Sequence, residues 1–92
     1  MSGTETSRRD MVQDQLPDDD LMFADGFDKA LIGYAEVWFD RGQERVAAYD
    51  RDLCIDKLIE DGRDWSEANE YFDFNVAGAY IGEKTPVFIT EI

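Results

Sequence analysis

The stretch ALIGYAEVWFDRGQERVAAY, residues 30–49, decides the fold of this 92-residue chain. Its first half, residues 30–39, is rich in aliphatic and aromatic residues and contains Glu36 as the only charge, which is typical of a β-strand. Residues 40–44 are polar and include a glycine, and a second short apolar run follows within residues 45–49. Two such runs joined by a glycine-containing loop predict an antiparallel β-hairpin.

Downstream of the hairpin, apolar residues recur at helical intervals. The positions that share one face are Cys54, Ile55, Leu58 and Ile59. This spacing predicts a helix near residues 51–61. Asp50 or Asp52 is expected to cap its start, because a carboxylate can accept hydrogen bonds from the first N–H groups of a helix. Gly62 is expected to end it, because glycine tolerates the backbone conformation that terminates helices.

A second helix is predicted near residues 65–76. Asp64 and Glu67 have the spacing of a capping box, in which each side chain accepts a hydrogen bond from the other residue's N–H group. The positions that recur at helical intervals are Trp65, Ala68, Tyr71, Phe72, Asn75 and Val76. Gly78 is the expected end of this helix, and residues 87–90, which are all of types that favour strands, then predict a third strand.

The expected order of elements is therefore β-β-α-α-β. It predicts an α+β fold in which a small antiparallel sheet of about three strands packs on two consecutive helices. Residues 21–92 are expected to form this single domain, and residues 1–20 a flexible acidic tail that has almost nothing to bury. The residues expected to be buried together are Trp38, Leu58, Trp65, Phe72 and Phe88.

The charge of the chain is strongly unbalanced. Asp and Glu number 22, Lys and Arg number 9, histidine is absent, and the formal net charge is -13 at pH 7. A surface of this sign repels phosphate backbones and attracts basic proteins, which argues against direct nucleic-acid binding and for a basic protein partner. The alternative is that the acidity serves solubility or adaptation to high salt, which the excess of Asp over Glu and of Arg over Lys also fits.

Motifs for catalysis are missing. A chain without histidine cannot build a Ser-His-Asp or Cys-His unit or a histidine-based zinc site. Cys54 lies on an apolar helical face, so it is expected to be buried and inert, and it cannot form an internal disulfide because it is the only cysteine. That cysteine usage favours the cytoplasm. We expect no catalytic residue and no cofactor.

One acidic segment matches a calcium loop only superficially. The carboxylates that fall at ligand positions are Asp50, Asp52, Asp56 and Asp61. Ile55 occupies the position where such a loop needs glycine, and the segment follows a helical pattern, so it cannot wrap around an ion. No apolar run approaches the roughly 18 to 20 residues of a membrane span, and the N-terminus lacks the order of a signal peptide. Neither a metal site nor a membrane association is expected.

The C-terminal stretch YFDFNVAGAYIGEKTPVF, residues 71–88, resembles a group of small, mostly uncharacterised proteins encoded by bacteriophages and related mobile elements. Residues 49–52 and 25–28 are similar to the same group, so the resemblance covers most of residues 21–92. It implies a viral or mobile-element origin but no catalytic role. The structural roles expected within the stretch are a side-chain hydrogen bond at a helix end for Asn75, a helix cap for Gly78 and a turn for Gly82.

The resemblance implies a role against the host, because small acidic viral proteins often neutralise host defence or transcription, and some occupy a positively charged nucleic-acid groove. The candidate partner-binding residues on the two helices are Asp52, Asp56, Glu60, Asp61, Glu67, Glu70 and Asp73. The expected function is a non-enzymatic inhibitor or DNA mimic that binds a basic host protein, for example a CRISPR defence component. The alternative is an accessory domain or homo-oligomer whose acidity is adaptive. An enzyme that uses carboxylates alone is a third interpretation, and it requires a carboxyl with a raised pKa in a cleft.

Overall fold

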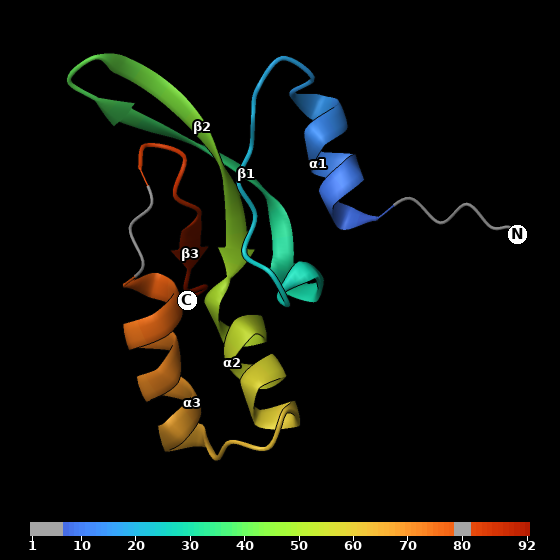
Figure 1. The fold of residues 1–92 in the computed structure, drawn as a ribbon, viewed down its shortest axis with the longest axis vertical. Coiled ribbons are helices and arrows are strands. Elements are labelled where there is room, and N and C mark those ends of the chain that lie inside the picture. The colour runs from blue at the N-terminus through green and yellow to red at the C-terminus, as the bar shows by residue number, and fades with distance from the viewer. Residues whose placement is uncertain (1–6, 79–81) are drawn as a thin grey trace, which may run out of the picture.

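One three-stranded sheet organises the fold, with helices before it and within the connection to its last strand (Figure 1). The computed structural model describes residues 7–78 and 82–92. The elements in chain order are α1 (Arg8–Gln15), the 3-10 turn η1 (Asp28–Ala30), β1 (Leu31–Phe39), β2 (Gly42–Asp50), α2 (Arg51–Glu60), α3 (Trp65–Phe72), the π-helical turn η2 (Asp73–Ala77) and β3 (Val87–Ile89). The expected α+β class is confirmed.

The predicted hairpin is present, with a shorter loop than the sequence indicates. β1 and β2 pair antiparallel, and Phe39 lies opposite Gly42, so only Asp40 and Arg41 form the turn. Gly42 has a φ of 128°, a conformation that side-chain-bearing residues rarely adopt. The polar residues that follow the turn extend the second strand.

The third strand changes the character of the sheet. Ala48, Tyr49 and Asp50 of β2 lie opposite β3, and the two strands run parallel. The expectation of an entirely antiparallel sheet is therefore wrong, and the sheet is mixed. The reason lies in the connection, because α3 turns back beside α2 toward the tip of the hairpin before the chain reaches β3 (Figure 1). β3 consequently enters the sheet in the same direction as β2.

The helix starts follow the sequence signals. Asp50 caps α2, and its carboxylate accepts a hydrogen bond from the N–H of Leu53 (3.2 Å). At the start of α3 the predicted capping box is complete. The Asp64 carboxylate accepts from the N–H of Glu67 (2.8 Å), and the Glu67 carboxylate accepts from the N–H of Asp64 (3.2 Å). Both caps fix where the helices begin relative to the sheet.

Gly62 ends α2, as the sequence predicts. Its φ of 113° lies in a region that glycine enters most readily. Its N–H donates to the carbonyl of Ile59 (3.0 Å), and the N–H of Arg63 donates to the carbonyl of Leu58 (3.2 Å). These two bonds form a Schellman motif, which satisfies the last carbonyls of the helix. The motif also fixes the backbone of Arg63.

The helical segment formed by α3 and η2 ends at Gly78, where a larger residue would be too close to the backbone. The Asn75 side chain donates to the carbonyl of Tyr71 (3.2 Å), as expected of a residue at a helix end. Gly78 follows η2 with helical backbone angles, so its role does not depend on a positive φ. A Cβ atom there would lie 2.8 Å from the carbonyl oxygen of Asp73, which is too close without a shift of the backbone.

The core lies where the base of the hairpin meets the helices. Tyr49 of β2 and Phe72 of α3 are its largest fully buried side chains. Phe88 of β3 packs against both rings, with centroids 5.5 Å and 4.9 Å away. The other buried members include Leu31, Ala47, Cys54, Ile55, Leu58 and Ala68.

Two residues of the expected core are on the surface. Trp38 is 73% exposed and Trp65 is 69% exposed, whereas Leu58 and Phe72 are buried and Phe88 is partly buried. Trp38 lies near the tip of the hairpin, which extends away from the helices (Figure 1). Trp65 is the first residue of α3, at the helix end farthest from the sheet (Figure 1). Trp38 lies on the face of β1 on which every second residue from Ile32 onward is exposed, so the strand is right but the face expected to be buried is wrong. Trp65 lies on the same face of α3 as the buried Ala68, but beyond the neighbours that would cover it.

The segment expected to be a tail contributes to the core. Val12 of α1 and Leu16 just after it are buried with the residues of the sheet and helices. The Arg8 guanidinium donates to the carbonyl of Leu31 (3.0 Å), which joins α1 to the start of β1. The expectation that this segment has almost nothing to bury is wrong, because two apolar side chains one turn apart suffice to hold a short helix against the domain. Residues 1–6 lie outside the described residues.

Candidate functional site

The outer face of α2 carries three exposed carboxylates. Asp52, Asp56 and Glu60 are four residues apart, and in the described part of the chain none of them forms an ion pair or a side-chain hydrogen bond. Residues at this spacing have Cβ atoms roughly 5 to 6 Å apart. Asp56 and Glu60 share a shallow hollow with Lys29 and Lys57, so the charge around them is locally balanced.

Three of the other candidate carboxylates already have partners. Asp61 pairs with Lys57 at 2.8 Å, within the last turn of α2. Asp73 pairs with Arg51 at 3.0 Å, which ties the end of α3 to the start of α2. Glu67 belongs to the capping box of α3. These three side chains therefore have structural roles, and a partner would have to compete with their existing interactions.

A groove on α3 places carboxylates beside an exposed aromatic ring. Glu67 and Glu70 line it together with Phe74, Arg63 and Tyr71. Phe74 is 77% exposed, and Glu70, one turn before it, has no ion pair among the described residues. The groove thus combines an apolar contact area with a carboxylate and a guanidinium, Glu70 and Arg63, neither of which forms an ion pair among the described residues.

The candidate carboxylates do not form one dense stripe. On α2 one carboxylate occurs about every 6 Å along the helix axis, whereas each DNA strand carries one phosphate per about 3.4 Å. α2 alone therefore has roughly half the linear charge density of a DNA strand. The acidic excess is also spread along the chain. Residues 7–20 carry five acids against two cations, residues 21–50 six against three, and residues 51–78 eight against three.

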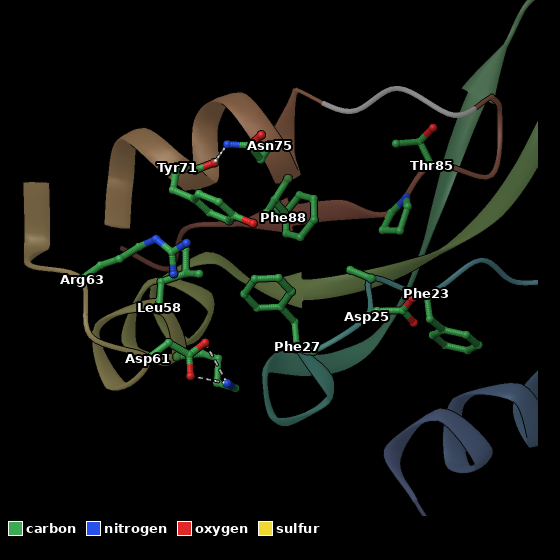
Figure 2. A pocket seen from close by; sticks show the side chains of 15 residues that line it. Phe23, Asp25, Phe27, Leu58, Asp61, Arg63, Tyr71, Asn75, Thr85 and Phe88 are labelled. Atoms are coloured by element: carbon green, nitrogen blue, oxygen red, sulfur yellow. Dashed lines mark hydrogen bonds and ion pairs between the residues drawn. The ribbon is translucent and has the colours of Figure 1, made fainter. Parts of the chain in front are cut away.

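A cavity of about 530 Å³ opens between residues 23–27, the ends of the two helices and the C-terminal strand (Figure 2). Phe27 and Phe88 approach each other across it from opposite walls, and Tyr71 and Leu58 close the side toward the helices (Figure 2). Two of the stretches on which the phage resemblance rests, 25–28 and 71–88, contribute residues to this cavity.

The rim of the cavity is charged, and most of its charges are paired. Lys57 and Asp61 form an ion pair there, and Asp25 pairs with Arg9 at 3.2 Å. Arg63 instead lies over the ring of Tyr71, with its guanidinium carbon 3.9 Å from the ring centroid. In the described residues the Arg63 side chain forms no hydrogen bond and no ion pair.

The single thiol is not placed for chemistry. Cys54 is fully buried, and burial, with a smaller contribution from the nearby Asp50 charge, raises the pKa of its thiol to about 12. The thiolate is therefore scarce at neutral pH. Within residues 7–78 and 82–92, no group of three or more Cys, Asp or Glu side chains is arranged to hold a metal ion. No helix in that part of the chain has the length and apolar content to cross a bilayer.

No protein-family model, curated protein or solved structure matches this chain. The resemblance to bacteriophage proteins therefore stays a prediction.

Two residues that line the groove on α3, Phe74 and Arg63, are absent from the candidates that the sequence predicts. Phe74 carries a usable signal, because it follows the buried Phe72 by two positions and so falls on the opposite face of the helix. Arg63 carries none, because its position over Tyr71 depends on how α3 folds back against α2.

Proposed function

We propose that this chain is a non-enzymatic interaction protein that binds a basic protein through the outer faces of α2 and α3. In the viral setting that the phage resemblance implies, the partner is a nucleic-acid-binding host protein in the cytoplasm, such as a component of a CRISPR defence complex. Occupation of its basic groove would inhibit the partner by competition with nucleic acid.

The observation that carries this proposal is the position of Phe74 beside Glu70. An exposed phenylalanine forgoes roughly 1.5 to 3 kcal/mol of burial free energy, and a surface adapted only for solubility gains nothing from it. Protein interfaces combine a central aromatic contact with a polar, charged rim. Phe74 fits the first part, and the unpaired carboxylate of Glu70 fits the second.

The charge of the molecule supports a basic partner. A net charge of -13 on a small protein produces a field that accelerates association with basic surfaces and slows association with acidic ones. Because α2 is less densely charged than DNA, mimicry by Asp52, Asp56 and Glu60 alone is too sparse. The partner surface is therefore expected to span both helices.

The spread of carboxylates over the whole chain favours a second candidate function. In that case the protein is an accessory domain whose acidity serves solubility or high salt. The two functions predict salt effects on different quantities, the first on the affinity for the partner and the second on the stability of the fold. A bound basic partner dissociates as salt rises, whereas a salt-adapted protein becomes more stable because its self-repulsion is screened.

The test begins with affinity capture from host lysate and mass spectrometry, followed by binding measurements on the recovered basic protein. The variant Asp56→Lys, Glu60→Lys, Glu70→Lys changes three exposed helix residues. The control Asp14→Lys, Asp18→Lys, Asp20→Lys changes net charge equally, at exposed positions remote from α2 and α3. We expect the first variant to keep its fold and lose at least about 30-fold in affinity, partly through association rate.

The control variant should keep most of its affinity. If both variants lose affinity equally, net charge and not these helices determines binding, and the proposed surface is wrong. Capture of no basic protein, together with a melting temperature that rises with salt, would favour the salt-adapted domain. Phe74→Ser should weaken binding without changing net charge, which separates the apolar contact from the field.

A further inference from the structure

We propose that the cavity beside Arg63 binds a small aromatic monocarboxylate, with its ring between Phe27 and Phe88 and its carboxylate on the Arg63 guanidinium. This ligand site goes beyond the proposed protein interface and does not depend on it.

The size and walls of the cavity suit such a ligand. Its volume of about 530 Å³ lies in the range of roughly 300 to 1,000 Å³ that small-molecule sites occupy. Its walls are mostly apolar and come from four separate segments of the chain, including Phe27, Leu58, Val76 and Phe88. A flat apolar body between Phe27 and Phe88 would make contact with rings on both sides (Figure 2).

Arg63 provides the polar anchor. Its backbone is held by the Schellman motif at the end of α2, and its guanidinium lies over the ring of Tyr71. A guanidinium that lies over an aromatic ring keeps the N–H groups of its planar edge available, and such an edge binds a carboxylate with two parallel hydrogen bonds. The side chain is thus oriented before a ligand arrives, and ordering it costs little binding free energy.

The pattern of charge pairing identifies the sign of the ligand. Although acidic residues outnumber basic ones 22 to 9, Arg63 has no carboxylate partner in the described part of the chain, while every other arginine there forms an ion pair or a hydrogen bond. On the rim, Asp61 pairs with Lys57, and Asp25 pairs with Arg9, which also pairs with Asp28. Of the two cations that line the cavity, Lys57 is paired and Arg63 has no ion pair among the described residues, so the guanidinium of Arg63 is the group open to an anion. The surrounding acidic field repels a dianion more than a monoanion, so a single carboxylate fits better than a phosphate.

The experiment compares two probes of the same shape. The probes are 2-naphthoate, which carries the carboxylate, and 2-naphthamide, which is neutral. Binding to the full chain is followed by amide and arginine side-chain NMR shifts during titration. We expect 2-naphthoate to shift the signals of Arg63 and Phe88 and to bind at least about tenfold more tightly than 2-naphthamide.

Three variants test whether the preference for 2-naphthoate over 2-naphthamide comes from Arg63. Arg63→Gln should remove the difference between the two probes, and Arg63→Lys should retain part of it, because lysine keeps the charge and loses the planar donor pair. Lys29→Gln removes the same charge from a cation outside this cavity and should change the affinity less than twofold. Equal affinity for the two probes, equal effects of Arg63→Gln and Lys29→Gln, or no shift of cavity signals at millimolar 2-naphthoate would each overturn the proposal.

Discussion

Phe72 meets Phe88 edge to face, with ring centroids 4.9 Å apart and ring planes at 86°. This contact joins the end of α3 to the short strand β3, which has only three residues paired with β2. Arg51 of α2 also contacts Phe72. Its guanidinium carbon lies over the Phe72 ring, 4.6 Å from the ring centroid. Phe72 therefore connects both helices with the edge of the sheet.

Phe72→Ala should lower the free energy of unfolding by roughly 3 to 5 kcal/mol, because it removes a fully buried ring and leaves a cavity. That loss approaches the whole stability of a small domain. Trp65→Ala is the matched control, since Trp65 is mostly exposed and its loss should cost less than about 1 kcal/mol. Urea denaturation checks both. A cooperative transition of Phe72→Ala near the parent midpoint would mean that the core is assigned wrongly.

Tyr49→Phe should destabilise the protein by roughly 1 to 3 kcal/mol. The Tyr49 hydroxyl accepts a hydrogen bond from the N–H of Ala24 (2.8 Å), and phenylalanine keeps the ring but leaves this N–H without its acceptor. The segment that forms one wall of the cavity should then open more often. Denaturation measures the stability, and hydrogen exchange at Ala24 measures the opening. Unchanged protection of that amide would show that the bond does not hold the segment.

Alkaline pH should destabilise the protein through Cys54. Burial raises the pKa of the folded thiol from 9.0 to about 12, so the unfolded chain loses its proton first as pH rises. The stabilisation is complete below pH 9 and is lost as pH rises toward 12. Burial also raises the pKa of Tyr49, which acts in the same direction. Urea midpoints at pH 8 and 10.5 should fall less for Cys54→Ala than for the parent, and identical pH slopes would contradict this explanation.

Leu16→Ala should cost roughly 2 to 4 kcal/mol, because Leu16 is buried against the domain. Met11→Ala, in the adjacent helix α1 but 57% exposed, should cost much less. Thermal denaturation of the two variants tests whether α1 is part of the cooperative unit. If proteolysis removes residues 1–20 and the remaining 21–92 melt at the parent temperature, the packing of α1 contributes nothing to stability.

Local signals in the sequence predict the elements whose causes are local. The hairpin, the Asp64 capping box, the Gly62 helix end and the burial of Cys54 depend on residues within a few positions of each other. Propensity, capping and apolar spacing describe such interactions directly. For the same reason the boundaries of α2 agree closely with the predicted helix.

The features that the sequence does not predict depend on distant segments. The direction of β3 is set by the path of α2 and α3. Trp38 is exposed because the packing of distant segments decides which face of β1 is covered, and Trp65 because α3 begins beyond its neighbours. The ion pair between Asp73 and Arg51 joins residues 22 positions apart, so a pattern that marks Asp73 as exposed acid cannot reveal that it is engaged. The sequence therefore predicts which acidic residues belong to the two helices, but not how they are arranged or which of them are engaged in ion pairs.

The parallel pairing of β3 also has a consequence for the order of folding. Ala48 pairs with Val87, far along the chain, whereas the hairpin closes through two residues. Closing the longer loop costs roughly 2 to 3 kcal/mol more chain entropy, so β3 should dock after the rate-limiting step. Phe88→Ala should then accelerate unfolding and leave the refolding rate nearly unchanged. Slower refolding with an unchanged unfolding rate in stopped-flow measurements would instead place β3 in the folding nucleus.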